Sequence, residues 1–155
     1  MKLLNVFLLV LAAAFAMPAH ADSANDMQIL RDKVKADKKL LVSQNMLLSD
    51  SEAKAFWPIY DAYQADLAKI NDQLGKAILA YAEAYNAGPV ANDTAKKLMN
   101  DYFAVEEAEL KLQRTYAAKL EKVLPAAKAA RYLQIENKIR SAIKYDLAAN
   151  IPLVM

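Results

Sequence analysis

Few side chains in this sequence could do covalent or metal chemistry. His20 is the only histidine, and the chain has no cysteine. Zinc sites, haem attachment and nucleophile triads depend on these two residue types, so we expect none of them after His20. An acidic run, Glu106, Glu107 and Glu109, is the remaining candidate, because a pair of its carboxylates could hold a hard cation. The alternative, which we favour, is a solvated helix face.

The sequence also lacks a phosphate-binding loop and paired acids in a catalytic context. We therefore predict a protein that is not an enzyme, with no catalytic residue, no metal site and no cofactor. The residues that remain of interest must act through structure or through binding.

Residues 1–21 are typical of a cleaved secretory signal peptide. Lys2 precedes an apolar run from Leu3 to Phe15, and a small-x-small ending closes at Ala21. The alternative is a membrane anchor, but the run is shorter than the about 20 apolar residues that a spanning helix needs. We predict cleavage after Ala21, export to the periplasm, and a mature chain, residues 22–155, that does not span the membrane.

The composition of residues 22–155 predicts a single all-α domain. Gly75 and Gly88 are the only glycines, and no stretch alternates with the period of two that marks a strand. A helix of about 35 residues is about 50 Å long, so we expect an elongated, bent helical hairpin. Four helical segments are predicted: from Ala24 to Met46, from Asp50 to Asn86, from Asn92 or Asp93 towards Pro125, and a fourth after Pro125 that ends before Pro152.

The segment LSDSEAKAFWPIY, residues 48–60, combines a helix start with a helix breaker. Ser49 can cap a helix, and Glu52 can reach back to close a capping box. Pro58 follows about two turns later, where proline removes a backbone hydrogen bond. We predict a bend at Pro58. Either the helix kinks there, or Pro58 begins the long helix and Ser49 caps a separate short turn.

Two segments of nine residues share a pattern, LSDSEAKAF at Leu48–Phe56 and LPAAKAARY at Leu124–Tyr132. Each has leucine first, a residue that can start a helix second, a polar residue fifth and an aromatic residue ninth. Ser49 can cap, and Pro125 is tolerated in a first turn. The first and ninth residues lie a little over two turns apart, so we expect them to pack together and to be buried. The alternative is a coincidence between alanine-rich helix starts.

These segments resemble the repeated LTxxQ motif of the Spy/CpxP family of periplasmic stress chaperones and adaptors, whose pattern is Leu-Thr-x-x-Gln. Leu48, Ser49 and Leu124 keep this pattern or come close to it. The positions that depart from it are Glu52, Pro125 and Lys128. The resemblance covers most of residues 25–147. It implies a thin, curved, antiparallel homodimer whose concave surface holds unfolded clients without ATP.

Charge is segregated along the chain. Asp50–Glu83 has three Lys against six acids, Asp93–Glu109 has two Lys against five, and Lys111–Lys144 has nine Lys or Arg against two. Opposite segments could pair across a hairpin or a dimer. We also hypothesise that the basic segment attracts acidic, partly unfolded chains or anionic lipid, whereas nucleic acid is not an expected partner. The candidate client-binding residues are Lys119, Lys122, Arg131 and Lys138.

Two functions of different classes follow. The first is an ATP-independent periplasmic chaperone that binds unfolded or misfolded envelope proteins under stress. The second is an adaptor that docks on the periplasmic domain of an envelope-stress sensor, without chaperone activity. A plain structural helical protein is a third and weaker hypothesis.

Overall fold

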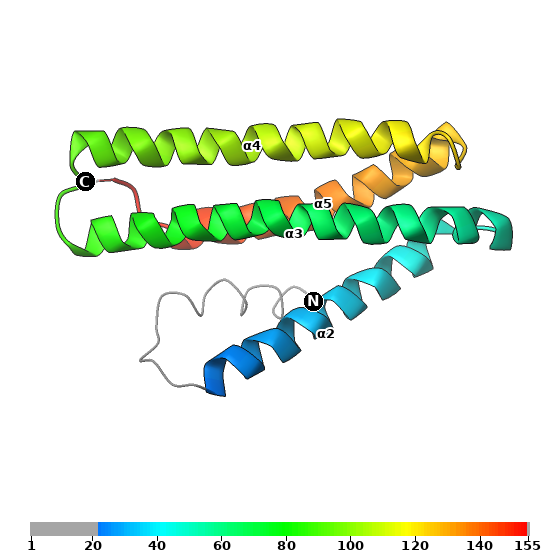
Figure 1. Ribbon diagram of the computed structural model, residues 1–155, viewed down its shortest axis with the longest axis horizontal. Helices are drawn as coiled ribbons and strands as arrows, with labels where there is room; N and C mark the ends of the chain where they lie inside the picture. The colour runs from blue at the N-terminus through cyan, green and yellow to red at the C-terminus, as the bar shows by residue number, and fades with distance from the viewer. Residues whose placement is uncertain (1–21, 155) are drawn as a thin grey trace. The chain divides into compact units, whose positions relative to one another are not determined.

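The computed structural model describes residues 22–154, and the predicted signal peptide lies outside them. No strand occurs among these residues, so the predicted all-α fold class is confirmed. In the part of the chain described, no helix is long and apolar enough to cross a membrane. The helices are α2 (Asp22–Met46), α3 (Asp50–Asn86), α4 (Asn92–Leu120) and α5 (Ala126–Asn150) (Figure 1).

The described residues divide into two compact units. The hairpin unit contains α3, α4 and the start of α5, from Leu48 to Leu133. The α2 unit contains α2 and the part of α5 from Gln134 onward. Because α5 is one helix, it contributes residues to both units.

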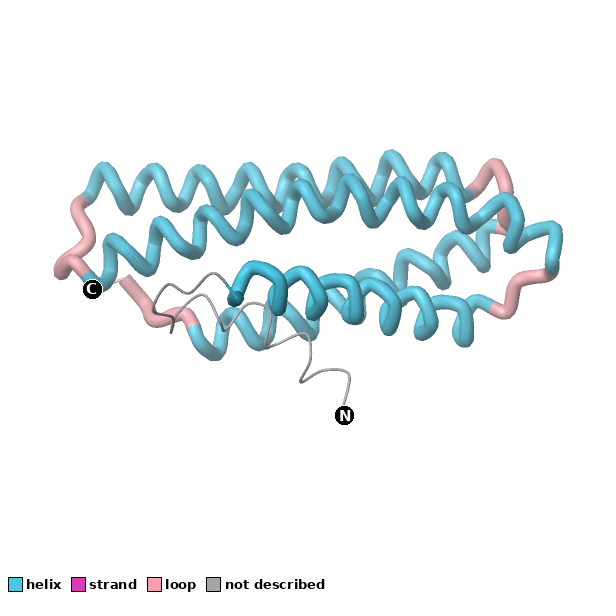
Figure 2. Tube along the Cα trace, turned by 60° about the horizontal axis from the view of Figure 1, so that its bottom comes forward, coloured by secondary structure: helices cyan, strands magenta, loops and turns pink. Residues whose placement is uncertain are grey.

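In the hairpin unit, α3 and α4 run antiparallel and lie side by side (Figure 2). The 37 residues of α3 span about 55 Å at 1.5 Å per residue. The helix ends because Gly88 has a φ of 126°, which disfavours any residue with a Cβ, and because Pro89 follows. The predicted hairpin is therefore present within this unit.

The core of the hairpin unit follows the helical period on both long helices. Its buried side chains recur at intervals of three or four residues, apart from one longer step, as expected for amphipathic helices. They are Phe56, Tyr60, Tyr63, Leu67, Ile70 and Ile78 on α3, and Val105, Glu109, Leu112, Tyr116 and Leu120 on α4.

Pro58 lies inside α3, which continues through it without interruption. The interpretation in which Ser49 caps a separate short turn is therefore wrong. Proline cannot donate a hydrogen bond to the carbonyl of Lys54, four residues earlier. Lys54 and Pro58 are both exposed, so water can hydrogen-bond to that carbonyl. The helix therefore tolerates the proline. The bend at Pro58 stays a prediction.

The α2 unit contains a buried ion pair. Lys38 Nζ lies 2.7 Å from Glu136 Oε2, and the two side chains are only 9% and 6% exposed. Burial lowers the pKa of Lys38, and the carboxylate of Glu136 opposes this shift. The pair joins α2 to α5. Removing one partner would leave the other charge buried alone, which would cost several kcal/mol.

Tyr116, a core residue of the hairpin unit, makes a polar contact through its hydroxyl. Its hydroxyl donates a hydrogen bond of 2.7 Å to Asp66 Oδ2, which joins α4 to α3. Burial, and then the hydrogen bond and negative charge of Asp66, raise the pKa of Tyr116 to about 12. The folded state therefore holds this proton more tightly than the unfolded state does.

We predict that the protein loses stability as the pH rises from the ordinary tyrosine value of 10.0 to about 12. Tyr116 contributes fully below that window, and its contribution disappears as the folded-state hydroxyl ionises. Tyr116→Phe should flatten the decline of melting temperature with pH. Tyr102→Phe, at an exposed tyrosine, is the control and should leave the decline unchanged. Equal slopes for the parent and Tyr116→Phe would contradict this account.

Leu124 and Leu48, the first residues of the two repeats, are not buried alike. Leu124 is 5% exposed, whereas Leu48 is only partly buried, contrary to the expectation of two equivalent core positions. We predict that Leu124→Ala lowers the free energy of unfolding by about 2–5 kcal/mol, the usual cost of truncating a buried leucine. Leu48→Ala should cost less. Urea denaturation followed by circular dichroism measures both, and an unchanged midpoint for Leu124→Ala contradicts the prediction.

Candidate functional site

The two repeats begin two helices in the same way. The carbonyl of Ser49 accepts a hydrogen bond of 2.8 Å from the backbone N–H of Ala53. The carbonyl of Pro125 likewise accepts one of 3.1 Å from Ala129. The second residue of each repeat therefore occupies the position immediately before its helix, and the alignment of the two segments corresponds to a common local structure.

The first repeat forms the predicted capping box. The N–H of Glu52 donates a hydrogen bond of 3.3 Å to Ser49 Oγ. In return, the N–H of Ser49 donates one of 2.7 Å to Glu52 Oε2. Two backbone donors at the start of α3 are thus satisfied by side chains, which stabilises the helix end.

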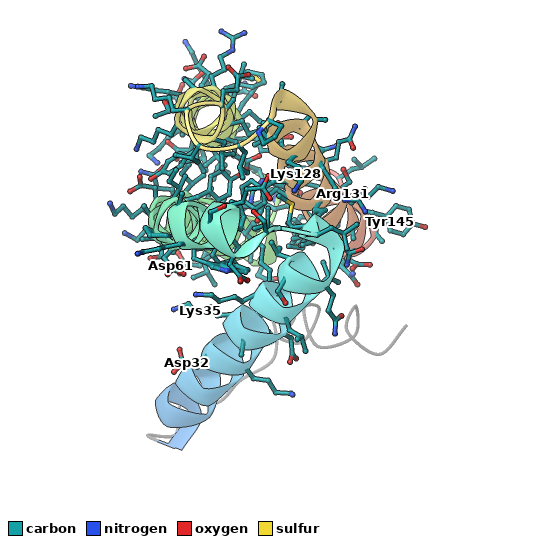
Figure 3. The ribbon with its side chains drawn as sticks, turned by 90° about the vertical axis from the view of Figure 1, so that its right-hand side faces the viewer. Asp32, Lys35, Asp61, Lys128, Arg131 and Tyr145 are labelled. Atoms are coloured by element: carbon teal, nitrogen blue, oxygen red, sulfur yellow. The ribbon has the colours of Figure 1, made fainter. Side chains whose placement is uncertain are left out.

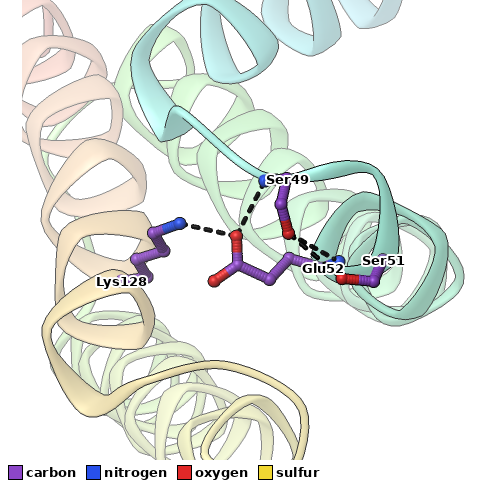
Figure 4. Close-up of polar contacts among 4 residues, drawn as sticks. All are labelled: Ser49, Ser51, Glu52 and Lys128. Carbon is purple, nitrogen blue, oxygen red and sulfur yellow. Dashed lines mark hydrogen bonds and ion pairs between the residues drawn. The ribbon is translucent and has the colours of Figure 1, made fainter.

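The fifth residues of the two repeats form an ion pair. Lys128 Nζ lies 2.5 Å from Glu52 Oε2, the same oxygen that accepts the N–H of Ser49 (Figure 4). The hydrogen bond from Lys128, followed by that from Ser49, lowers the pKa of Glu52. One carboxylate oxygen therefore joins the cap of α3 to the first turn of α5.

The ninth residues of the repeats also meet. The rings of Phe56 and Tyr132 pack edge to face with centroids 5.1 Å apart, and both side chains are fully buried. Because the fifth residues pair with each other and so do the ninth, the starts of α3 and α5 run parallel and in register. Gln64 Nε2 lies 3.2 Å from the Tyr132 hydroxyl, which gives that buried group a hydrogen-bond partner.

We call this arrangement the motif corner, and it consists of Ser49, Glu52, Phe56, Lys128 and Tyr132. Its polar groups are engaged with one another, and its rings lie in the core of the hairpin unit. The corner therefore positions two helices. The two positions that depart most in charge from the family pattern are bonded to each other.

The predicted client-binding residues are all exposed. Lys119, Lys122 and Arg131 belong to the hairpin unit, and Lys138 belongs to the α2 unit. Arg131 follows Lys128 by three residues on α5 (Figure 3). Lys119 Nζ lies 4.1 Å from the ring centroid of Tyr116, a cation–π contact. The three predicted client-binding residues of the hairpin unit thus lie around the end of α4 and the start of α5.

The acidic run on α4 does not form one solvated face, which corrects the favoured interpretation. Glu107 is exposed and Glu106 is partly buried, but Glu109 is 4% exposed and lies in the hairpin core. These carboxylates therefore point in different directions around the helix. Within residues 22–154, no group of three histidine, cysteine or acidic side chains is arranged to hold a metal ion.

An apolar surface on α4 was not predicted from the sequence. Met99, Phe103 and Leu110 are 52%, 51% and 50% exposed, and Tyr102 contacts Phe103 at the edge of the row. These residues lie about one third of a turn around the helix from the core side chains, by the 3.6-residue period. We call Met99, Phe103 and Leu110 the α4 stripe. Their spacings of four and seven are a signal for such a row, but apolar residues on an amphipathic helix are normally assigned to its buried face.

We predict that Glu52→Gln lowers the melting temperature, because glutamine keeps a capping acceptor but loses the charge that Lys128 binds. The same substitution should matter less in a Lys128→Gln background. In the parent, this stabilisation is complete above pH 4.5, the ordinary value for glutamate, and is lost as the pH falls through the lowered folded-state pKa. That acid dependence should be weaker in Glu52→Gln.

Thermal melts of the four proteins of this double-mutant cycle, from neutral to acidic pH, measure the coupling. Glu83→Gln removes an exposed carboxylate from the same helix and is the matched control. Strictly additive effects of the two substitutions would mean that the fifth residues do not stabilise each other.

Comparison of the chain with protein-family models, curated proteins and solved structures found no match. Membership of the Spy/CpxP family therefore stays a prediction. It is carried by the two repeats, by the in-register pairing of their fifth and ninth residues, and by the predicted signal peptide.

Proposed function

We propose that this chain is an ATP-independent periplasmic chaperone that binds unfolded or misfolded envelope proteins. The observation that carries the proposal is the α4 stripe. Single apolar residues are common on protein surfaces, but a periodic row of large ones along a helix face is typical of an interaction surface. The resemblance of the two repeats to the Spy/CpxP pattern and the predicted export signal support the client class and the compartment.

The expected strength of the stripe suits reversible holding. Fully burying a large apolar side chain contributes about 1.5–3 kcal/mol, so completing the burial of three half-exposed ones contributes about 3 kcal/mol in all. A millimolar affinity already requires about 4 kcal/mol. The stripe alone therefore binds weakly, and a client must make further contacts. Such binding depends on apolar burial and needs no nucleotide.

Three exposed cations of the hairpin unit, Lys119, Lys122 and Arg131, can supply part of the remaining attraction. Exposed charges act over about 8 Å at physiological ionic strength. They should therefore increase the capture of acidic clients at low salt and contribute little at high salt. Lys138, in the α2 unit, belongs to the same proposal.

A second function has one observation in its favour. The α4 stripe repeats at the spacing by which one helix recognises another, so it could equally serve an adaptor that docks on a defined sensor helix. The homodimer implied by the family resemblance remains part of the proposal, and sedimentation analysis tests it.

We predict that the processed protein suppresses aggregation of denatured clients without ATP, and that the α4 stripe is required. Replacing Met99, Phe103 and Leu110 with Ser should abolish suppression at every salt concentration. The melting temperature should change little, because surface substitutions usually alter stability by about 0.5 kcal/mol or less. Light scattering of several unrelated clients measures the effect.

The comparison variant replaces Lys119, Lys122, Arg131 and Lys138 with Gln. It should melt normally and lose suppression only at low salt and only for acidic clients. A stripe variant that suppresses like the parent would show that α4 is not the client surface. Failure of the parent with every client would contradict the chaperone function and leave the adaptor.

A further inference from the structure

We propose that peroxides switch off the α4 stripe reversibly by oxidising the thioether of Met99 to a sulfoxide. The inference rests on the proposed function, because it names a way of regulating the surface that clients are proposed to bind. It does not depend on which partner lies on the stripe, since it follows from the chemistry of one of the three side chains that form it.

Met99 lies open to solvent. The residue is 52% exposed, whereas Met46, the last residue of α2, is only 1% exposed. An oxidant reaches an exposed thioether more readily than one that is closely packed in a core. The chain has no cysteine, so no thiol of its own competes for the oxidant. Of these two methionines, Met99 should therefore react first.

The covalent step transfers one oxygen atom from hydrogen peroxide to sulfur. A lone pair of the thioether attacks one peroxide oxygen, the O–O bond breaks, and an S–O bond forms. Sulfur gives up two electrons, which reduce the peroxide. The proton left on the sulfur-bound oxygen passes to the departing hydroxide, which leaves as water. The products are one sulfoxide and one water, and the protein supplies no further reactant.

The product changes the character of the stripe. A thioether is apolar, whereas a sulfoxide is polar and chiral. Met99 and Phe103 are four residues apart on α4, so they are neighbours on one face of the helix. A client that covers this face must remove water from the sulfoxide oxygen, which is unfavourable unless the client supplies a hydrogen-bond donor. Oxidation therefore weakens the binding of an apolar segment there.

The fold should survive this change. The buried side chains of α4 lie between Val105 and Leu120, so Met99 is outside the core. Changes at exposed positions usually alter stability little. Oxidation of the buried Met46 would instead place a polar group among packed side chains and destabilise the protein. Loss of client binding without loss of stability is thus the expected signature of Met99.

The experiment treats the processed protein with hydrogen peroxide and follows each methionine by peptide mass spectrometry. Met99 should be oxidised several-fold faster than Met46. When Met99 is fully oxidised, the protein concentration that gives half-maximal suppression of client aggregation should rise at least about fivefold, as expected from losing the burial of one half-exposed apolar side chain. The melting temperature should stay the same. The two methionine sulfoxide reductases, one for each epimer, should restore suppression.

Three variants assign the effect to one sulfur atom. Met99→Leu keeps the stripe apolar but cannot form a sulfoxide, so peroxide should leave its suppression unchanged. Met99→Gln introduces a polar side chain and should weaken suppression without peroxide. Met46→Leu is the matched control, because it is a conservative change at the buried methionine, and it should respond to peroxide as the parent does.

Equal oxidation rates of Met99 and Met46 would overturn the inference, and so would full suppression by protein oxidised at Met99. Loss of suppression by peroxide-treated Met99→Leu would also overturn it, because another group would then be the target.

A parent protein that suppresses no client before oxidation would instead contradict the proposed chaperone function. Binding of the apolar dye bis-ANS then tests the inference separately. Peroxide should lower the dye fluorescence of the parent but not that of Met99→Leu. An unchanged signal from the oxidised parent would overturn the inference.

Discussion

One carboxylate oxygen connects the local and the tertiary structure of the hairpin unit. Glu52 Oε2 accepts the N–H of Ser49, which completes the cap of α3, and it also accepts Lys128 from the first turn of α5. Because both bonds converge on one atom, the start of α3 and its contact with α5 share one side chain. The ring contact between Phe56 and Tyr132, one turn further on, then fixes the direction in which the two helices run.

Much of this fold follows from signals that are local in sequence. The capping residues Ser49 and Glu52, the stop at Gly88 and the break before Pro125 predicted helices that the structure confirms. These signals depend on neighbouring residues, so no tertiary information was needed. Pro58 was harder, because whether a proline breaks a helix depends on what satisfies the carbonyl four residues earlier.

The features that were missed depend on contacts between distant segments. The burial of Glu109 and the ion pair of Lys38 with Glu136 cannot be inferred from charge patterns, which favour placing both carboxylates in solvent. The exposure of the α4 stripe was missed for the opposite reason, since apolar residues on an amphipathic helix are normally assigned to the core. In the amino-acid sequence, a helix with two apolar faces has the same pattern as a helix with one wide apolar face.

The pairing of the fifth residues has a consequence for how such a chain can diverge. Glu52 and Lys128 are 76 positions apart in the sequence but act as one unit. A change at one position weakens the pair unless the other changes to suit it, so the two are expected to vary together during evolution. A pattern that specifies each repeat separately, such as Leu-Thr-x-x-Gln, does not describe coordinated changes at the two fifth positions. A lineage can therefore keep the corner while losing the motif by which it would be recognised.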